Sequence, residues 1–293
     1  MTKERFFEVG ESAAGLRLDE FLAGQLHELS RMRIAALLRG GAAEVNGEAG
    51  RAGLRLRAGD RVRVEAGEAP PNAMTPEPLP LEVVHEDEHL AVVVKPAGML
   101  MHPTRGVKTG TLANALAYRL GAGGVRPGLV HRLDRATSGL VVVAKTREAH
   151  ARLSEHFRRR LVEKRYLALL RGEVEADELQ IRAPVGREEG ARPPWRVTEA
   201  GRPAETRLRV LGRRPGLTLV ELEPVTGRTN QLRIHCAHVG HPIAGDEWHA
   251  ADGLPRLCLH AARLAFNHPA TNERMSFLSP LPVGVEAVWR GGG

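Results

Sequence analysis

A proline-rich segment divides this chain and limits what it can fold into. Residues 66–80 read AGEAPPNAMTPEPLP and contain five prolines. Proline fixes φ and has no backbone N–H, so this segment cannot be helical and favours an extended connector. We therefore predict a small domain over residues 1–68, a linker over residues 69–81 and a larger domain over residues 82–293.

The composition is typical of a soluble globular protein, with 42% hydrophobic and 26% charged residues. Two cysteines, Cys236 and Cys258, form no CxxC motif, which excludes a disulfide scaffold and suits a reducing compartment. The sequence shows neither a signal peptide nor a membrane-spanning apolar stretch, so we expect a cytoplasmic protein without membrane association. A net charge of +7 permits a polyanionic partner.

The small domain is predicted to contain two helices followed by strands. Apolar spacing predicts helices over residues 16–26 and 31–39, the second capped by Ser30. Residues 42–47 are expected to form a strand ending in an Asn-Gly turn, and residues 51–66 alternate apolar residues with arginines as strands do.

Seven arginines of this domain have two interpretations. They could form a solvated polar face, or a surface for a polyanion; they outnumber the acidic residues nearby, which favours the polyanion. The arginines are Arg31, Arg33, Arg39, Arg55, Arg57, Arg61 and Arg63. Residues 15–65 also resemble the S4-like RNA-binding domain, through RLDEFL, LSRMRIAALLRGG, VNG and LRAGDRVRV. That resemblance implies RNA binding by a small α/β domain.

The larger domain is predicted to be α+β with a largely antiparallel sheet, because its strands outnumber its helices and do not alternate with them. Strands are expected over residues 89–100, 139–146, 164–174 and 217–225. One helix is expected over residues 147–160, with Leu153, Phe157 and Leu161 on one face. Another is expected over residues 229–240, capped by Thr229 and ended by Gly240.

A polar loop between two apolar segments is the strongest candidate for chemistry. Within residues 128–145, Asp134 stands between Arg132 and Arg135. A neighbouring cation lowers the pKa of a carboxyl group, which suits a nucleophile or a general base. The alternative is a structural salt bridge, with Thr137 and Ser138 capping the loop.

The segment HRLDRATSGL, residues 131–140, resembles the signature of the RluA-type pseudouridine synthases. Further matches follow in the order typical of that family, and with the S4-like segment they are similar to its RluD and RluC branch. They are VVKPAGMLMHP, EKRYLALLRG, GRTNQLRIHCAHVGHPIAGD and LHAARLAFNHP. The resemblance implies the pseudouridine synthase fold, a mixed, largely antiparallel sheet crossed by an RNA cleft.

The resemblance also implies roles for four residues. Asp134 corresponds to the catalytic aspartate, and Arg233 to the basic residue that pairs with it. Tyr166 corresponds to the tyrosine that packs on the target base, and Arg132 to the arginine that fills the space left by the flipped nucleotide.

The implied reaction breaks the C–N bond between uracil and ribose, turns the base and forms a C–C bond. The base must leave its stack, and an aromatic ring recovers about 1–3 kcal/mol by stacking. No redox step occurs and no group is lost, so we expect no cofactor. The implied partner is structured RNA, most simply large-subunit ribosomal RNA, with no obligate protein partner. Attack by Asp134 on the sugar, attack on the base and proton removal from the ribose all stay open.

Two departures from the family pattern stand near the implied site. Asn230 gives GRTNQ where the family often has GRTHQ, and residues 245–250 read GDEWHA where GDPLYG is common. Neither changes Asp134, Tyr166 or Arg233. The histidines at 235, 238 and 241 have spacing that zinc sites use, but Gly240 interrupts the helix and no carboxylate completes a motif, so we expect no metal.

Two other functions remain as alternatives. A non-catalytic RNA-binding or ribosome-assembly factor would not need Asp134, Tyr166 and Arg233 together. A hydrolase such as a nucleosidase would use Asp134 with water, but it would not need an RNA-binding domain in front.

Overall fold

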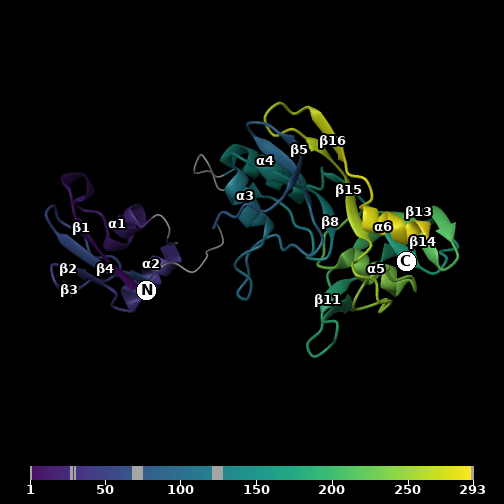
Figure 1. The fold of residues 1–293 in the computed structure, drawn as a ribbon, viewed down its shortest axis with the longest axis horizontal. Coiled ribbons are helices and arrows are strands. Elements are labelled where there is room, and N and C mark those ends of the chain that lie inside the picture. The colour runs from purple at the N-terminus through teal and green to yellow at the C-terminus, as the bar shows by residue number, and fades with distance from the viewer. Residues whose placement is uncertain (1, 27–28, 30, 68–74, 121–127, 292–293) are drawn as a thin grey trace. The chain divides into compact units, whose positions relative to one another are not determined.

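The computed structural model describes residues 2–26, 29, 31–67, 75–120 and 128–291. The chain divides into two compact units, Met1–Asn72 and Ala73–Gly293 (Figure 1). The capping role predicted for Ser30 lies outside the described residues.

The first unit packs two helices against a four-stranded sheet of order β1-β4-β2-β3. Its elements are β1 (Thr2–Glu8), a short 3-10 helix (Glu11–Ala13), α1 (Leu18–Gln25), α2 (Arg31–Arg39), β2 (Ala43–Val45), β3 (Glu48–Ala49) and β4 (Arg61–Gly67). Leu22 of α1, Ile34 of α2 and Val64 of β4 meet in its core. The predicted Asn-Gly turn is present, because Asn46 and Gly47 have φ of 53° and 85°.

Two parts of this unit differ from the sequence prediction. Strand β1 was not predicted, because Phe6 and Phe7 are its only apolar residues and Phe6 is exposed. The first half of residues 51–66 forms no strand, and Arg55 makes only an isolated bridge with Arg17. Leu56 is nevertheless buried. The alternation of apolar residues and arginines therefore marks which residues are buried, although this part of the chain does not pair as a strand.

The second unit is built on a ten-stranded sheet, and the predicted α+β class with a largely antiparallel sheet is confirmed. The main strand order is β10-β13-β14-β9-β15-β8-β6-β5, with β16 beside β15 and β7 beside β8. Every pairing in this sheet is antiparallel except that of β8 with β15. The strands are β5 (Glu82–Glu86), β6 (Leu90–Lys95), β7 (Gly128–Leu129), β8 (Ser138–Ala144), β9 (Glu163–Arg171), β10 (Glu178–Arg182), β13 (Glu205–Arg214), β14 (Leu217–Pro224), β15 (Leu259–Asn267) and β16 (Arg274–Leu278). A separate pair is formed by β11 (Val185–Arg187) and β12 (Trp195–Val197).

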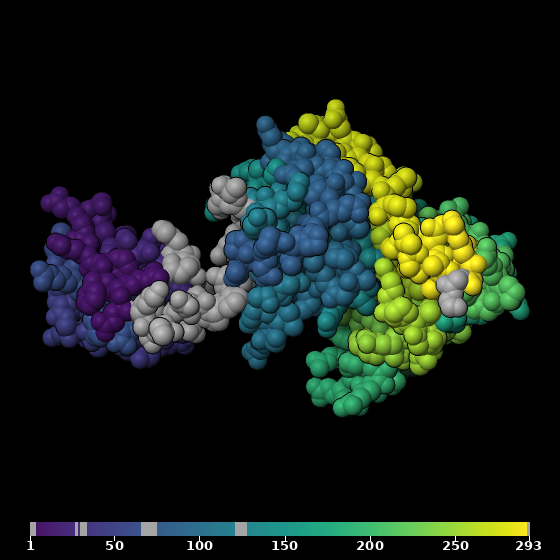
Figure 2. Space-filling model, in the orientation of Figure 1, coloured from purple at the N-terminus to yellow at the C-terminus, as the bar shows by residue number. Residues whose placement is uncertain are grey.

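Helices cover both faces of the sheet around β8. Successive residues of a strand point to opposite faces, so Val141 contacts the core under α3 (Leu112–Leu120), whereas Val142 contacts the core under α4 (Arg147–Arg158). Burial on both faces explains the unbroken apolar run of β8. Elsewhere, α5 (Gln231–His238) and α6 (Val283–Arg290) share a core with β9 and β14. The C-terminal helix α6 lies at the surface (Figure 2).

The ends of two helices correct the sequence prediction. Helix α4 ends at Arg158, so Leu161 lies beyond it and is exposed, although Leu153 is buried as expected. Helix α5 is preceded by Asn230 in the left-handed conformation, with φ of 55°, and Thr229 does not cap it. An asparagine tolerates that conformation better than most residues do.

The second half of the predicted linker contacts the larger unit. The side-chain amide of Asn114 in α3 donates to the Thr75 carbonyl at 2.8 Å, and the Glu77 N–H donates to the Asn114 carbonyl at 3.1 Å. Leu81 packs into the core beneath α3. In the part of the chain that is described, no helix is long and apolar enough to cross a membrane.

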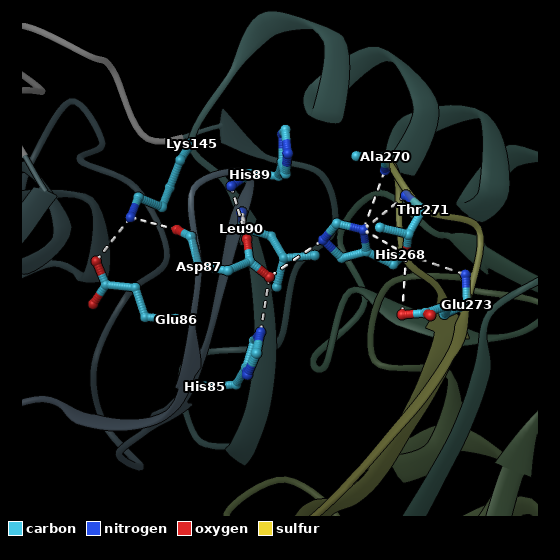
Figure 3. A network of polar contacts seen from close by, with 10 residues as sticks. All are labelled: His85, Glu86, Asp87, His89, Leu90, Lys145, His268, Ala270, Thr271 and Glu273. Atoms are coloured by element: carbon cyan, nitrogen blue, oxygen red, sulfur yellow. Dashed lines mark hydrogen bonds and ion pairs between the residues drawn. The ribbon is translucent and has the colours of Figure 1, made fainter.

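A polar network around Asp87 joins the β5–β6 turn to the segment after β15 (Figure 3). Its Oδ1 accepts the N–H groups of His89 and Leu90 at 2.7 and 2.8 Å. Its Oδ2 lies 2.8 Å from Nε2 of His85 and 3.2 Å from Nε2 of His268. Burial alone would raise the pKa of Asp87, but these hydrogen bonds lower it to about 2.

We expect Asp87→Asn to destabilise the larger unit by roughly 1–3 kcal/mol at pH 7. A carboxyl group whose folded-state pKa is depressed stabilises the protein above its unfolded pKa, about 4, and that contribution is lost as pH falls towards 2. The difference in free energy of unfolding between wild type and variant should shrink over this window in urea titrations. Glu88→Gln, at an exposed neighbour, is the control; an equal loss there would contradict the role of Asp87.

Candidate active site

The loop between β7 and β8 is anchored by one apolar residue. Leu133 is buried and packs with Leu112 and Leu116 of α3. On either side of it, Arg132 is exposed and Asp134 is half-buried. The buried leucine therefore anchors the loop, while the cation and the carboxylate stay accessible at the cleft.

The same loop is held from behind by the segment after β6. The Arg135 carbonyl accepts the N–H of Gly98 at 2.8 Å and Nζ of Lys95 at 3.2 Å. The Arg135 side chain returns a hydrogen bond to the Gly98 carbonyl at 3.0 Å. Lys95 is fully buried and also donates to the Pro96 and Met99 carbonyls at 2.8 Å. These contacts join the VVKPAGML and HRLDRATSGL segments through several hydrogen bonds.

Strand register brings Tyr166 beside the loop. Gly139 at the start of β8 pairs with Ala261 of β15, and Ala261 pairs with Tyr166 of β9. Gly139 has φ of 121°, and a Cβ there would lie 2.4 Å from the Ala261 carbonyl oxygen, so only glycine permits this close pairing. Burial, and then the charge of Asp134, raise the pKa of Tyr166 above its ordinary value, so the phenol stays protonated at neutral pH.

Asp134, Tyr166, Arg233 and Arg132 line one cleft of about 690 Å³. The structure thus brings together the four residues predicted in the larger domain. The cleft is also strongly basic, with further lining from Arg158, Arg160, Lys164, Arg202 and Arg228. Its only carboxylates among the described residues are those of Asp134 and Glu223.

The electrostatics of Asp134 differ from the prediction. Burial raises its pKa, and this effect exceeds the lowering by the charges of Arg132, Arg233 and Lys95 and by the backbone N–H of Asn230. The prediction that neighbouring cations would leave this pKa below its ordinary value is therefore wrong. The carboxylate is instead a destabilised anion held among cations, which makes it a stronger base.

Arg233 pairs with a different carboxylate from the one predicted. Its Nη2 and Nε lie 2.6 and 2.8 Å from Oδ1 and Oδ2 of Asp246, and both side chains are buried. The expected direct pair with Asp134 is absent from the ion pairs of the described residues. The Nε and Nη2 groups of Arg233 are both bound to Asp246. Arg233 affects Asp134 only through its positive charge, which lowers the pKa of Asp134.

The divergent GDEWHA loop contacts this arginine directly. The Trp248 ring lies over the Arg233 guanidinium, 4.4 Å from carbon to ring centroid, and the Trp248 N–H donates to Asp246 at 3.0 Å. His249 places Nδ1 3.0 Å from Oδ2 of the same aspartate. Sequence reasoning missed these three roles, although Asp246 ends the matched segment GHPIAGD and could have been considered on that basis.

Three histidines in and near the site contact backbone groups. Nε2 of His131 accepts the Val142 N–H at 3.0 Å, and burial lowers the pKa of His131 to about 3, so its ring is neutral. His235 contacts the Ala183 carbonyl and His241 the Arg171 carbonyl, each at 3.0 Å. Among the described residues, no group of three His, Cys, Asp or Glu side chains is placed to hold a metal ion.

The arginines of the first unit are only partly available. The Arg39 and Arg55 side chains donate to the Ala35 and Gly15 carbonyls, and both remain exposed, as does Arg57. Arg63 is surrounded by the carboxylates of Glu4, Glu44 and Glu65. Strand β1, which the sequence prediction lacked, supplies Glu4. The side chains of Arg31 and Arg33 lie outside the described part of the structure.

Comparison with known proteins identifies a family. Residues 89–238 match the family described as RNA pseudouridylate synthase. The chain is 39% identical over 278 residues to an uncharacterized RNA pseudouridine synthase, YlyB, of Bacillus subtilis, covering 91% of this chain and 90% of that protein. It is 37% identical to ribosomal large subunit pseudouridine synthase C of Vibrio cholerae, covering 97% and 96%.

A solved structure supports the same assignment. Human RNA pseudouridylate synthase domain containing 1 aligns with a TM-score of 0.59 and 29% identity, over 72% of this chain and 86% of that one. The family match spans the anchored loop, Tyr166 and Arg233. This chain belongs to the RNA pseudouridylate synthase family and is an RNA pseudouridine synthase of the RluA type.

Proposed function

We propose that this enzyme isomerises specific uridines in structured large-subunit ribosomal RNA, with Asp134 as its catalytic residue. The observation that carries the proposal is the basic cleft in which Asp134, Tyr166 and Arg233 converge from separate elements. The choice of RNA rests on relatives such as the Vibrio cholerae protein, whose name specifies the ribosomal large subunit.

We expect the cleft to receive a uridine that has left its helix. Flipping a base costs a few kcal/mol, and stacking on the Tyr166 ring recovers part of this free energy. The protonated Tyr166 hydroxyl can donate a hydrogen bond or a proton to the bound base. Arg132 is exposed at the cleft, in a position to occupy the space from which the nucleotide departed.

Asp134 must be ionised in each of the three chemical routes. An anion is needed to attack the sugar, to attack the base or to remove a ribose proton. Arg132, Arg233 and Lys95 supply positive charge that favours the ionised form of this half-buried carboxylate and offsets part of the cost of its burial. Since the reaction rearranges bonds within one nucleotide, these side chains suffice without a redox cofactor. The cytoplasm, where ribosomal RNA matures, is the compartment in which we expect the enzyme to act.

Product analysis tests the proposal. Pseudouridines should be mapped in ribosomal RNA from cells with and without the gene, and purified protein should be incubated with unmodified ribosomal RNA. Isomerised uridine at a site lost in the deletion strain is the expected result. Released uracil would identify a nucleosidase, and unchanged RNA a non-catalytic binding protein.

We further propose that the first unit is an S4-like RNA-binding domain. Arg39, Arg55 and Arg57 are exposed on it, and Arg39 and Arg55 keep guanidinium donors for phosphates beyond those that bind the Ala35 and Gly15 carbonyls. Contacts of this kind position an RNA-binding protein without reading the base. Because Arg63 is held by three glutamates, we assign the phosphate contacts to the other six arginines.

Deleting residues 1–68 should weaken RNA binding and leave the catalytic unit folded. The deletion retains residues 75–81, which contact α3. Each lost phosphate contact flattens the slope of log K against log salt by about 0.7–0.9, so losing six contacts should flatten it by roughly four to five. KM should rise more than kcat falls. Salt titrations of both proteins on one RNA provide the measurement; equal slopes would make the unit a structural appendage.

A further inference from the structure

Arginines on the exposed face of the main sheet are neutralised by cross-strand carboxylates. Arg165 of β9 and Arg207 of β13 lie 3.0 and 3.6 Å from Glu223 of β14. Arg209 lies 3.1 Å from Glu221. This face has little net charge left to attract a polyanion, because its cations and carboxylates alternate.

Three arginines at the cleft have no such partner. Arg160 follows α4, Arg202 precedes β13 and Arg228 lies between β14 and α5, yet all three line the cleft that contains Asp134. Within the described residues, none of the three forms an ion pair with a carboxylate. Glu223, the other acidic residue of the cleft, is engaged by Arg165 and Arg207.

Two of these arginines are held next to each other by the backbone. Nε of Arg228 donates to the Pro203 carbonyl at 3.1 Å, which ties its guanidinium to the residue after Arg202. The backbone of Arg202 is itself fixed to Val185 by hydrogen bonds of 2.9 and 3.0 Å. Burial and the charges of Arg202 and Arg160 lower the pKa of Arg228, so the three cations repel one another. An anion would relieve that repulsion.

The backbone of Arg160 is a second, independent observation. Arg160 has φ of 59°, and Leu161 N–H closes α4 on the His156 carbonyl at 2.9 Å. Glycine is the usual residue at such a helix end, and an L side chain there costs roughly 1–2 kcal/mol. Arg160 is exposed at this strained position and lines the cleft, which favours a role for its side chain in binding.

We propose that Arg160, Arg202 and Arg228 form a binding site for successive phosphodiester groups of the RNA strand that carries the target uridine. Guanidinium groups bind phosphate oxygens in bidentate fashion, and three of them from three segments match a run of phosphates better than a single anion. The site fixes the backbone next to the flipped nucleotide, so it sets affinity and orientation without selecting the base. This inference rests on the proposed function only in taking RNA as the ligand.

The test compares two triple variants with equal loss of charge. One carries Arg160→Gln, Arg202→Gln and Arg228→Gln; the matched control carries Arg182→Gln, Arg207→Gln and Arg209→Gln on the neutralised face. Both are made in full-length Asp134→Asn protein, so binding is measured without turnover. The probe is a single-stranded RNA of about 20 nucleotides with one central uridine.

The cleft variant should bind at least tenfold more weakly at 0.1 M salt. Its slope of log K against log salt should fall by about two, from three contacts at about 0.7 each. The control should change the slope by less than about 0.5. Equal changes in the two variants would overturn the site, because only general charge would then matter. This outcome leaves the catalytic assignment untouched, since that assignment is judged by product formation.

Two further measurements locate the contact. Replacing the phosphates beside the central uridine with neutral methylphosphonates should weaken binding by the parent protein and have little additional effect on the cleft variant; additive losses would overturn the assignment. Arg160→Gly should weaken RNA binding while the thermal midpoint stays the same or rises, because glycine relieves the backbone. A lower midpoint with unchanged affinity would show that Arg160 is structural.

Discussion

Asp134→Asn should abolish pseudouridine formation while RNA affinity stays within a few-fold of wild type. Asparagine keeps the size and the acceptor oxygen that faces the Asn230 N–H, but it cannot become an anion. Loss of the proposed catalytic carboxylate should lower the single-turnover rate by at least roughly 10²–10⁴. The measurement is conversion of ribosomal RNA under excess enzyme, with affinity determined separately.

The pH dependence supplies a second check on the same residue. The proposed mechanism requires the anion of Asp134, so the rate should fall as pH falls through the pKa of Asp134. An ordinary aspartate has a pKa of about 4. Because burial raises the pKa of Asp134, this acidic limb of the rate–pH profile should lie at higher pH than that. Glu199→Gln, at an exposed position outside the cleft, is the control and should retain full activity. Near-normal turnover by Asp134→Asn would exclude Asp134 as the catalyst.

Asp246→Ala should cost about 3–5 kcal/mol of stability, because it leaves the Arg233 guanidinium buried without its partner. Urea unfolding at neutral pH measures this loss. Glu155→Gln removes an exposed carboxylate paired with Arg158 and should cost less than about 1 kcal/mol. Similar losses in the two variants would contradict the buried pair.

Arg233 should affect catalysis as well as stability. Arg233→Ala removes a positive charge that lowers the pKa of Asp134, so the acidic limb of the rate–pH profile should move to higher pH. Arg233→Lys keeps a charge and should move the limb less, although a lysine cannot reproduce the side-on pair with Asp246. An unchanged profile and rate in Arg233→Ala would remove Arg233 from the site.

The sequence predicted four residues that the structure brings to one cleft, because they belong to short, ordered motifs. Asp134 and Arg132 share one loop, and Tyr166 lies in a strand of recognisable pattern. The true partner of Arg233 was missed because it stands 13 residues further along, beyond a helix end and a turn whose path no local pattern reveals. The pKa of Asp134 was missed for a related reason: neighbouring cations are visible in a sequence, whereas the depth of burial depends on distant strands.

Errors in the fold have equally local causes. Thr229 is the better capping residue by type, but the backbone enters α5 through a left-handed Asn230. Strand β1 has charged residues at most positions, so no apolar pattern marks it as a strand. It forms because it pairs with β4, which lies at the other end of the first unit in sequence. Its Glu4 helps neutralise Arg63, so a missed strand also led to a miscounted surface charge.

The parallel pairing of β8 with β15 also determines when the enzyme becomes competent during its own synthesis. Ser138 and His260, which share a hydrogen bond across that pairing, are 122 residues apart in sequence. Strand β15 also separates β8 from β9, so the segments carrying Asp134 and Tyr166 lack their common neighbour until it is made. Contacts this distant form late, because the intervening chain must first be synthesised and closed into a loop. A nascent chain still short of β15 therefore has Asp134 and Tyr166 but no assembled cleft.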